Sequence, residues 1–142
     1  MPVIPVNLVG KKILITGPTG QVARPVVEQF ARIADVSVLA RFRKAEDRDL
    51  MESMGATVLQ ADLADAGSLA IVPEDFEYVL NFAVVKSGDF DYDLAANAEG
   101  VGNLMTRCRL RVCRPGAPRG KCTAGRQPPC HVSHVQHFEN RR

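Results

Sequence analysis

The residues best suited to chemistry form a glycine-rich turn near the amino terminus. The segment reads Thr16-Gly17-Pro18-Thr19-Gly20-Gln21-Val22-Ala23 and follows the apolar run 13–15. Gly17 permits a tight turn out of a strand, Gly20 lets backbone approach a ligand closely, and the small Ala23 lets the next helix pack on the sheet. Unpaired N–H groups at that helix N-terminus attract an anion. The turn therefore predicts a site for a dinucleotide pyrophosphate, lined by Thr19, Gln21 and Val22.

A basic cluster follows the second predicted strand, 35–40. Arg41 comes directly after that strand, with Arg43 and Lys44 beside it. An acid at this place would hydrogen-bond the ribose hydroxyls of NAD, whereas an arginine favours the 2′-phosphate of NADP. The alternative is a solvated basic loop. We expect NADP, with NAD as the second choice, and expect Arg41 to meet the adenosine phosphate.

Two further strand ends carry candidate contacts to the same cofactor. At the first, Asp62 can accept from the exocyclic amine of adenine while the Leu63 backbone lines the pocket, the alternative being a turn or cap residue. At the second, Asn81-Phe82-Ala83-Val84 closes a strand. Small residues there let backbone pass under the ribose and nicotinamide, so Phe82, Ala83 and Val84 are expected cofactor contacts, and ordinary buried strand is the alternative.

The elements that must position these residues alternate between strands and helices. Apolar runs predict strands over 12–16, 35–40, 57–61 and 76–83, and helical spacing follows each of them. In the last helix, 91–107, the expected buried positions are Leu94, Val101, Leu104 and Met105. This alternation predicts an α/β fold of the Rossmann type: a doubly wound parallel sheet with strand order 3-2-1-4 and helices on both faces.

Four segments in register carry a family resemblance. They are the glycine turn 16–23, the pair Asp62-Leu63, the strand end 81–84 and the helical segment 97–104. Together they resemble the short-chain dehydrogenase/reductase superfamily, specifically its extended branch, the NAD-dependent epimerase/dehydratase family. The resemblance covers about residues 10–107 and implies NAD(P) bound across the carboxyl edge of the sheet. It also implies that Asn97 supports the active site, with a plain helix-surface asparagine as the alternative.

The catalytic residues of that family have no counterpart in this chain. The family uses a tyrosine, followed four positions later by a lysine that lowers the tyrosine pKa, to move a proton during hydride exchange. The tyrosines here are Tyr78 and Tyr92, and Phe82 and Ala96 stand four positions after them. We therefore expect a cofactor-binding fragment without turnover and assign no catalytic residue. The alternatives are an NADP-sensing or partner-binding protein on the same fold and an inactive truncated product.

The composition changes sharply near position 107. Residues 1–107 hold ten Lys/Arg against fifteen Asp/Glu, a net charge of −5, whereas 108–142 hold eight against one, a net charge of +7. We therefore divide the chain into a partial NAD(P)-binding domain, 1–107, and an irregular basic tail, 108–142. The tail starts in mid-helix and is rich in Arg, Pro, Gly, Cys and His, which favours a disordered or frame-shifted sequence over a genuine basic extension.

The tail also raises two other kinds of binding. A nucleic-acid-binding arm is disfavoured because Phe138 is its one aromatic residue and no basic stripe is ordered. Zinc is disfavoured because no Cys-x-x-Cys pair occurs. The potential ligands all lie after position 107: Cys108, Cys113, Cys122, Cys130, His131, His134 and His137.

The remaining expectations concern location and association. The start of the chain lacks a basic, uninterrupted apolar signal, and no apolar run approaches the ~18 residues of a membrane span. We expect a cytoplasmic protein with reduced cysteines and no membrane contact. If the fourth strand is an uncovered edge, it invites pairing with another copy or aggregation.

Overall fold

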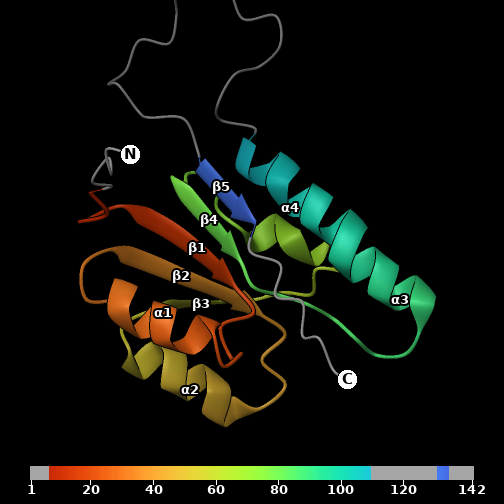
Figure 1. Cartoon of the computed structure of the whole chain (residues 1–142), viewed down its shortest axis with the longest axis horizontal. Coiled ribbons are helices and arrows are strands. Elements are labelled where there is room, and N and C mark those ends of the chain that lie inside the picture. Colours follow the sequence, from red (N-terminus) through yellow and green to blue (C-terminus); the bar gives the residue numbers. More distant parts are fainter. Residues whose placement is uncertain (1–6, 110–130, 135–142) are drawn as a thin grey trace, which may run out of the picture.

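The computed structural model describes residues 7–109 and 131–134 and shows a parallel sheet of five strands (Figure 1). The order across the sheet is β3-β2-β1-β4-β5, which confirms the predicted order of the first four. The strands are β1 (Lys12–Thr16), β2 (Asp35–Ala40), β3 (Thr57–Gln60), β4 (Tyr78–Asn81) and β5 (His131–His134).

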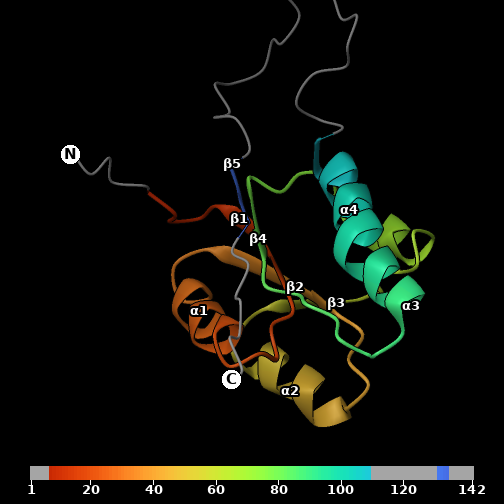
Figure 2. The same ribbon diagram turned by 45° about the vertical axis from the view of Figure 1, so that its right-hand side comes forward.

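Helices cover both faces of this sheet. Figure 2 shows α1 and α2 on one side and α3 and α4 on the other. The elements are α1 (Ala23–Phe30), α2 (Ala45–Ser53), the 3₁₀ turn η1 (Ser68–Ile71), α3 (Phe90–Leu94), the π-helical turn η2 (Ala95–Glu99) and α4 (Gly100–Arg109).

Alternation along β1 divides the core into two layers. Ile13 and Ile15 pack with Val27 of α1 and Met51 of α2, whereas Leu14 packs on the opposite face with Leu104 of α4. All of these side chains are at most 1% exposed. Because successive strand side chains point to opposite faces, a strand covered on both faces needs the continuous apolar run seen at 13–15.

β5 is a strand that our sequence analysis did not predict. It lies within the segment assigned to the irregular tail and pairs in parallel with β4, from Tyr78 opposite His131 to Asn81 opposite His134. β4 is therefore not an edge strand, and the expectation of an uncovered edge there was wrong. A strand of four residues is too short for a period-two pattern to be recognised in the sequence. Its hydrogen bonds to β4 join backbone N–H and C=O groups, and every residue type except proline carries both. Cys108 and Arg109, the first residues of that segment, belong to a helix that ends at Arg109, so the predicted start of the irregular tail at 108 was two residues too early. Residues 110–130 and 135–142, including Cys113, Cys122, Cys130 and His137, lie outside the described residues.

The helix expected over 91–107 is present in three consecutive parts. Leu104 is fully buried as predicted, and Val101 and Met105 are partly buried, but Leu94 is 45% exposed, so its predicted burial was wrong. The reason is η2, because a π-helical turn bonds i to i+5 and shifts the register of the residues before it against those after it.

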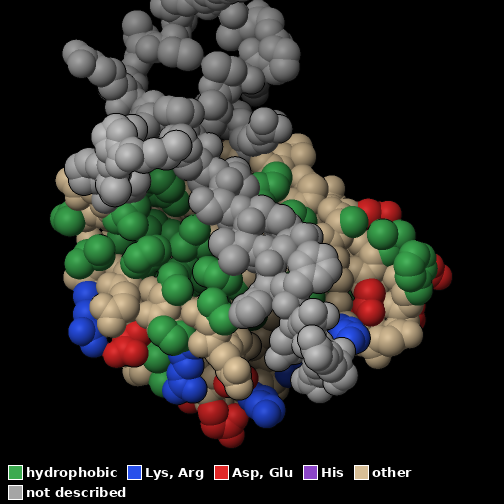
Figure 3. All heavy atoms as spheres, viewed as in Figure 1, with side chains coloured by type: hydrophobic (Ala, Val, Ile, Leu, Met, Phe, Trp, Pro, Cys, Tyr) green, Lys and Arg blue, Asp and Glu red, His purple; other side chains and the backbone are tan. Residues whose placement is uncertain are grey.

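Apolar side chains are also found on the surface. Figure 3 shows many of them gathered on the face beside β1 and α1, while charged side chains surround the α2 end. Val9, Val22 and Ile33, which flank α1 or β1, are each more than 40% exposed. Within the described ranges, none of the helices has the length and apolar character needed to cross a bilayer.

Gly100 is required where α4 crosses the chain after β3. A Cβ added to Gly100 would lie 2.0 Å from the carbonyl oxygen of Leu63, and backbone cannot yield as a flexible side chain would. We expect Gly100→Ala to lower the free energy of unfolding by about 1–3 kcal/mol, measured by urea denaturation.

Gly102, two residues along the same helix, is the matched control. A Cβ there meets no atom within 4 Å. Gly102→Ala should therefore leave the stability unchanged or raise it by up to about 1 kcal/mol through helix propensity. Equal decreases in the free energy of unfolding of the two variants would contradict the close packing of α4 on Leu63.

Candidate functional site

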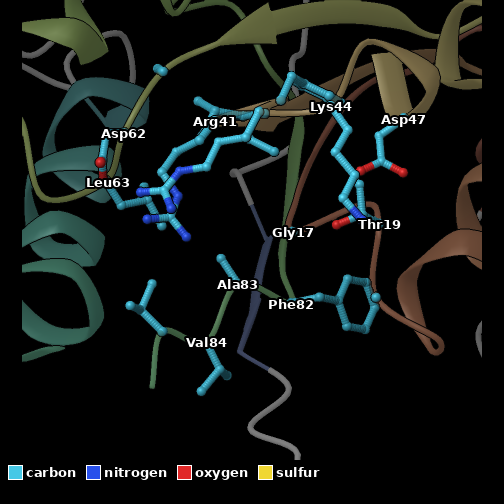
Figure 4. Close-up of a pocket in the computed structure, with 17 residues that line it drawn as sticks. Gly17, Thr19, Arg41, Lys44, Asp47, Asp62, Leu63, Phe82, Ala83 and Val84 are labelled. Carbon is cyan, nitrogen blue, oxygen red and sulfur yellow. The ribbon is translucent and has the colours of Figure 1, made fainter. Parts of the chain in front are cut away.

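A cavity of about 350 Å³ opens at the carboxyl ends of the central strands (Figure 4). It is lined by residues from the glycine turn after β1, the 39–44 segment and Asp47, residues 61–63, and residues 82–85 after β4. Ligands in open parallel sheets bind outside the carboxyl ends of the strands, and the volume lies within the usual range of small-molecule sites.

The floor of this cavity is a close contact between two backbone segments. Gly17 has φ +63°, and a Cβ on it would lie 2.8 Å from both N and Cα of Ala83. The buried side chains of Thr16 and Asn81 are hydrogen-bonded to each other, and the Ala83 N–H donates to the Thr16 hydroxyl at 3.3 Å. β1 and β4 are thus tied together at the point where both chains turn under the cavity.

Backbone N–H groups without acceptors in the described part of the chain come directly after the part of the glycine turn that lines the cavity. Gly20 N–H donates to the Gly17 carbonyl at 3.2 Å and Arg24 N–H to the Gly20 carbonyl at 3.0 Å. The intervening amides of Gln21 and Val22 have no acceptor among the described residues. Ala23, which begins α1, is 1% exposed and allows the close helix packing expected of a small residue.

A buried aromatic residue, Phe42, positions the segment that carries Arg41 and Arg43. Phe42 has φ +44° and only 9% exposure, and it packs in the core layer that contains Met51. A positive φ is uncommon for a bulky residue. The buried ring fixes the turn after β2, so that Arg41 and Arg43 both line the cavity.

Asp62 stands opposite this basic segment. Its Oδ1 accepts from the Ala64 N–H at 2.9 Å, and its own N–H donates to the Ser68 hydroxyl at 3.0 Å. Its Oδ2 accepts from the Tyr92 hydroxyl at 3.0 Å, and that hydroxyl accepts from Arg41 Nη1 at 2.7 Å. Asp62 therefore both forms a turn and lines the cavity.

A sequence model of the NmrA-like family matches residues 10–92, which is more than half of the chain and includes every segment of the cavity. The chain belongs to the NmrA-like family. The comparison with curated proteins gave no match.

Solved structures share the fold of this NmrA-like chain. A short-chain dehydrogenase/reductase from Serratia marcescens is 21% identical, with a TM-score of 0.62 over 72% of this chain and 51% of that one. BdcA, solved in complex with NADPH, is 19% identical, with a TM-score of 0.62 over 72% of this chain and 48% of that one. The structure of BdcA from E. coli is 20% identical, with a TM-score of 0.59 over 72% of this chain and 57% of that one. The chain thus spans about half the length of these proteins, and the resemblance to the short-chain dehydrogenase/reductase fold is confirmed.

The cavity brings together most of the residues that the sequence analysis named. Those that line it are Gly17, Thr19, Gly20, Arg41, Asp62, Leu63, Phe82, Ala83 and Val84. Gln21, Val22 and Ala23 follow the lining part of the turn, and Asn97 lies in η2 outside the lining. Tyr92 and Phe42 were missed as site residues, and the only signal for Tyr92 was that it is one of two tyrosines.

The chain after β4 is held in place by two side chains from α3 and η2. Asn97 Nδ2 donates to the Val85 carbonyl at 2.7 Å, and Val85 N–H donates to Asn97 Oδ1 at 2.8 Å. Asp93 accepts from the backbone N–H and the hydroxyl of Ser87, and these bonds hold the pKa of Asp93 below its ordinary value. Asn97 therefore supports the cavity wall through the backbone of Val85.

The lowered pKa of Asp93 predicts a pH-dependent contribution to stability. A carboxyl whose folded-state pKa is lowered stabilises the fold fully above its unfolded-state pKa, and this contribution is lost as the pH falls through the folded-state value. We expect Asp93→Asn to be less stable than wild type at neutral pH, and the difference to shrink as the pH falls below 3.8, measured by urea denaturation across an acid series.

Asp91→Asn removes the same charge from the first turn of α3 and serves as the control. Among the described residues, the Asp91 side chain accepts no hydrogen bond, so its substitution should not reproduce the pH-dependent difference. A difference for Asp93→Asn that is independent of pH would contradict the assignment.

Proposed function

We propose that this chain binds a nicotinamide dinucleotide, with NADP preferred over NAD, along the carboxyl edge of its sheet. One observation carries the proposal: a single cavity joins the glycine turn, the arginines after β2 and Asp62. These are the chemical groups that a pyrophosphate, a 2′-phosphate and an adenine need. The NADPH complex of the structural neighbour BdcA supports the same choice of ligand.

The residues present fit the shape and charge of this cofactor. Gly17 allows the backbone of the turn to lie on Ala83, where any Cβ would collide. The amides that follow Gly20 suit the pyrophosphate, and Arg41 suits the adenosine phosphate as a planar donor of several N–H groups. Asp62, already fixed through Oδ1, suits the adenine amine. Ala83 and Val84 suit the ribose and the nicotinamide.

The proposed role of these residues is binding and orientation. A bound nicotinamide supplies hydride chemistry, as in oxidoreductases and epimerases that resemble this chain. The sequence has no Tyr-x-x-x-Lys pair. We therefore propose that the residues of the cavity hold the cofactor and that none of them transfers the proton.

Arg41→Ala tests the preference for NADP. We expect its dissociation constant for NADPH to rise by about tenfold or more, because a hydrogen bond to a charged group contributes roughly 1.5–3 kcal/mol and 1.4 kcal/mol is a factor of ten. Binding of NADH, which lacks the 2′-phosphate, should change by less than about threefold. The measurement is a titration followed by cofactor fluorescence.

Arg32→Ala is the matched control, because Arg32 pairs with Glu28 beyond the cavity and carries the same charge. It should leave both affinities unchanged. An Arg41→Ala variant that binds NADPH as wild type does would overturn the phosphate role of Arg41. A folded wild-type protein that binds neither cofactor would overturn the proposed function.

A further inference from the structure

Tyr92 of α3 lies between the two charged residues on the adenosine side of the cavity. Arg41 Nη1 donates to its hydroxyl at 2.7 Å, and the hydroxyl donates to Asp62 Oδ2 at 3.0 Å. The guanidinium carbon of Arg41 lies 6.0 Å from the centre of the Tyr92 ring, a separation consistent with a contact through the hydroxyl. The hydroxyl of one half-buried phenol therefore contacts both charged residues.

The Tyr92 hydroxyl bridges Arg41 and Asp62 by hydrogen bonds, without an ion pair between them. Arg41 and Asp62 form no ion pair with each other among the described residues. Arg41 uses Nη1 for the phenol, and its other guanidinium N–H groups have no acceptor within that part of the chain. The planar guanidinium is thus held on one side by Tyr92, and its remaining donors are available to an anion in the cavity.

Such an arrangement orders the arginine before any ligand arrives. A free arginine side chain loses rotamer entropy when it is fixed, and an arginine that is already fixed has less to lose on binding. Asp62 does not depend on Tyr92 in the same way, because its other oxygen accepts from Ala64 N–H at 2.9 Å. Removing the phenol hydroxyl should therefore disturb Arg41 more than Asp62.

We propose that Tyr92 is a positioning residue that sets the preference for a dinucleotide bearing an adenosine 2′-phosphate. This inference rests on the proposed function of the cavity. Tyr92 directs the guanidinium of Arg41 towards the 2′-phosphate and prevents it from pairing with Asp62. It adds a second determinant of cofactor choice, 51 positions along the chain from the first.

A double-mutant cycle of Arg41→Ala and Tyr92→Phe tests the inference in the full chain. Tyr92→Phe keeps the ring and removes only the hydroxyl. We expect it to weaken NADPH binding by about five- to tenfold and NADH binding by less than about twofold. In the Arg41→Ala background the same change should have no further effect on NADPH, because the residue acts through Arg41.

Tyr78→Phe is the matched control, since Tyr78 lies in β4 and does not line the cavity. It should change neither affinity. Equal weakening of NADPH and NADH by Tyr92→Phe, or additive effects in the double variant, would show a general structural role and overturn the inference while the proposed function stands. If folded wild type binds neither cofactor, both fall together.

A second measurement follows ligand binding to the wild-type chain and uses a variant for signal assignment alone. The chain contains two tyrosines and no tryptophan. With ¹³C-labelled tyrosine, NMR should show two ring environments, and the Tyr78→Phe spectrum assigns them. Adenosine 2′,5′-bisphosphate should shift the Tyr92 signal, and adenosine 5′-phosphate should shift it much less. Equal shifts with the two nucleotides would contradict a link between Tyr92 and the 2′-phosphate.

Discussion

The contact between the ends of β1 and β4 determines the rest of the site. Gly17 lies against the backbone of Ala83 more closely than any side chain would permit, and the buried Thr16 and Asn81 bond to each other at the last ladder position. Buried polar side chains are stable only when they are paired, and here each supplies the other's partner. This contact fixes the direction in which both chains leave the sheet and so creates the floor of the cavity.

The walls of the cavity follow from similar backbone constraints. Phe42 anchors the turn that presents the arginines, Gly100 lets α4 pack against Leu63, and Asn97 holds Val85 by two hydrogen bonds. Each of these residues fixes the course of the backbone around the cavity. The positively charged and acidic groups then meet through Tyr92, which connects the β2 side to the β3 side.

Sequence patterns predicted the fold well where burial alone decides it. β1 and β2 have the predicted bounds, because strands covered on both faces need largely apolar runs, interrupted in β2 by the buried Ser37 alone between Val36 and Ala40. The glycine turn was also predictable, since few residue types permit φ +63° beside a neighbouring backbone. β5, the π-helical turn and the role of Tyr92 were not predictable. β5 depends on backbone pairing, and the π-helical turn depends on one extra residue in a helical turn. The role of Tyr92 depends on a contact across 51 positions. None of these leaves a periodic pattern in the sequence.

We propose that one cavity, floored by the Gly17–Ala83 contact, binds a nicotinamide dinucleotide. Amide hydrogen exchange of the full chain with and without NADPH tests it most directly, because protection is read segment by segment. We expect slower exchange at 17–23, 41–44, 62–63 and 82–84, the segments at the cavity, on adding NADPH, with little change in α1 beyond its first turn. Protection elsewhere, or none at saturating NADPH in a folded protein, would contradict it.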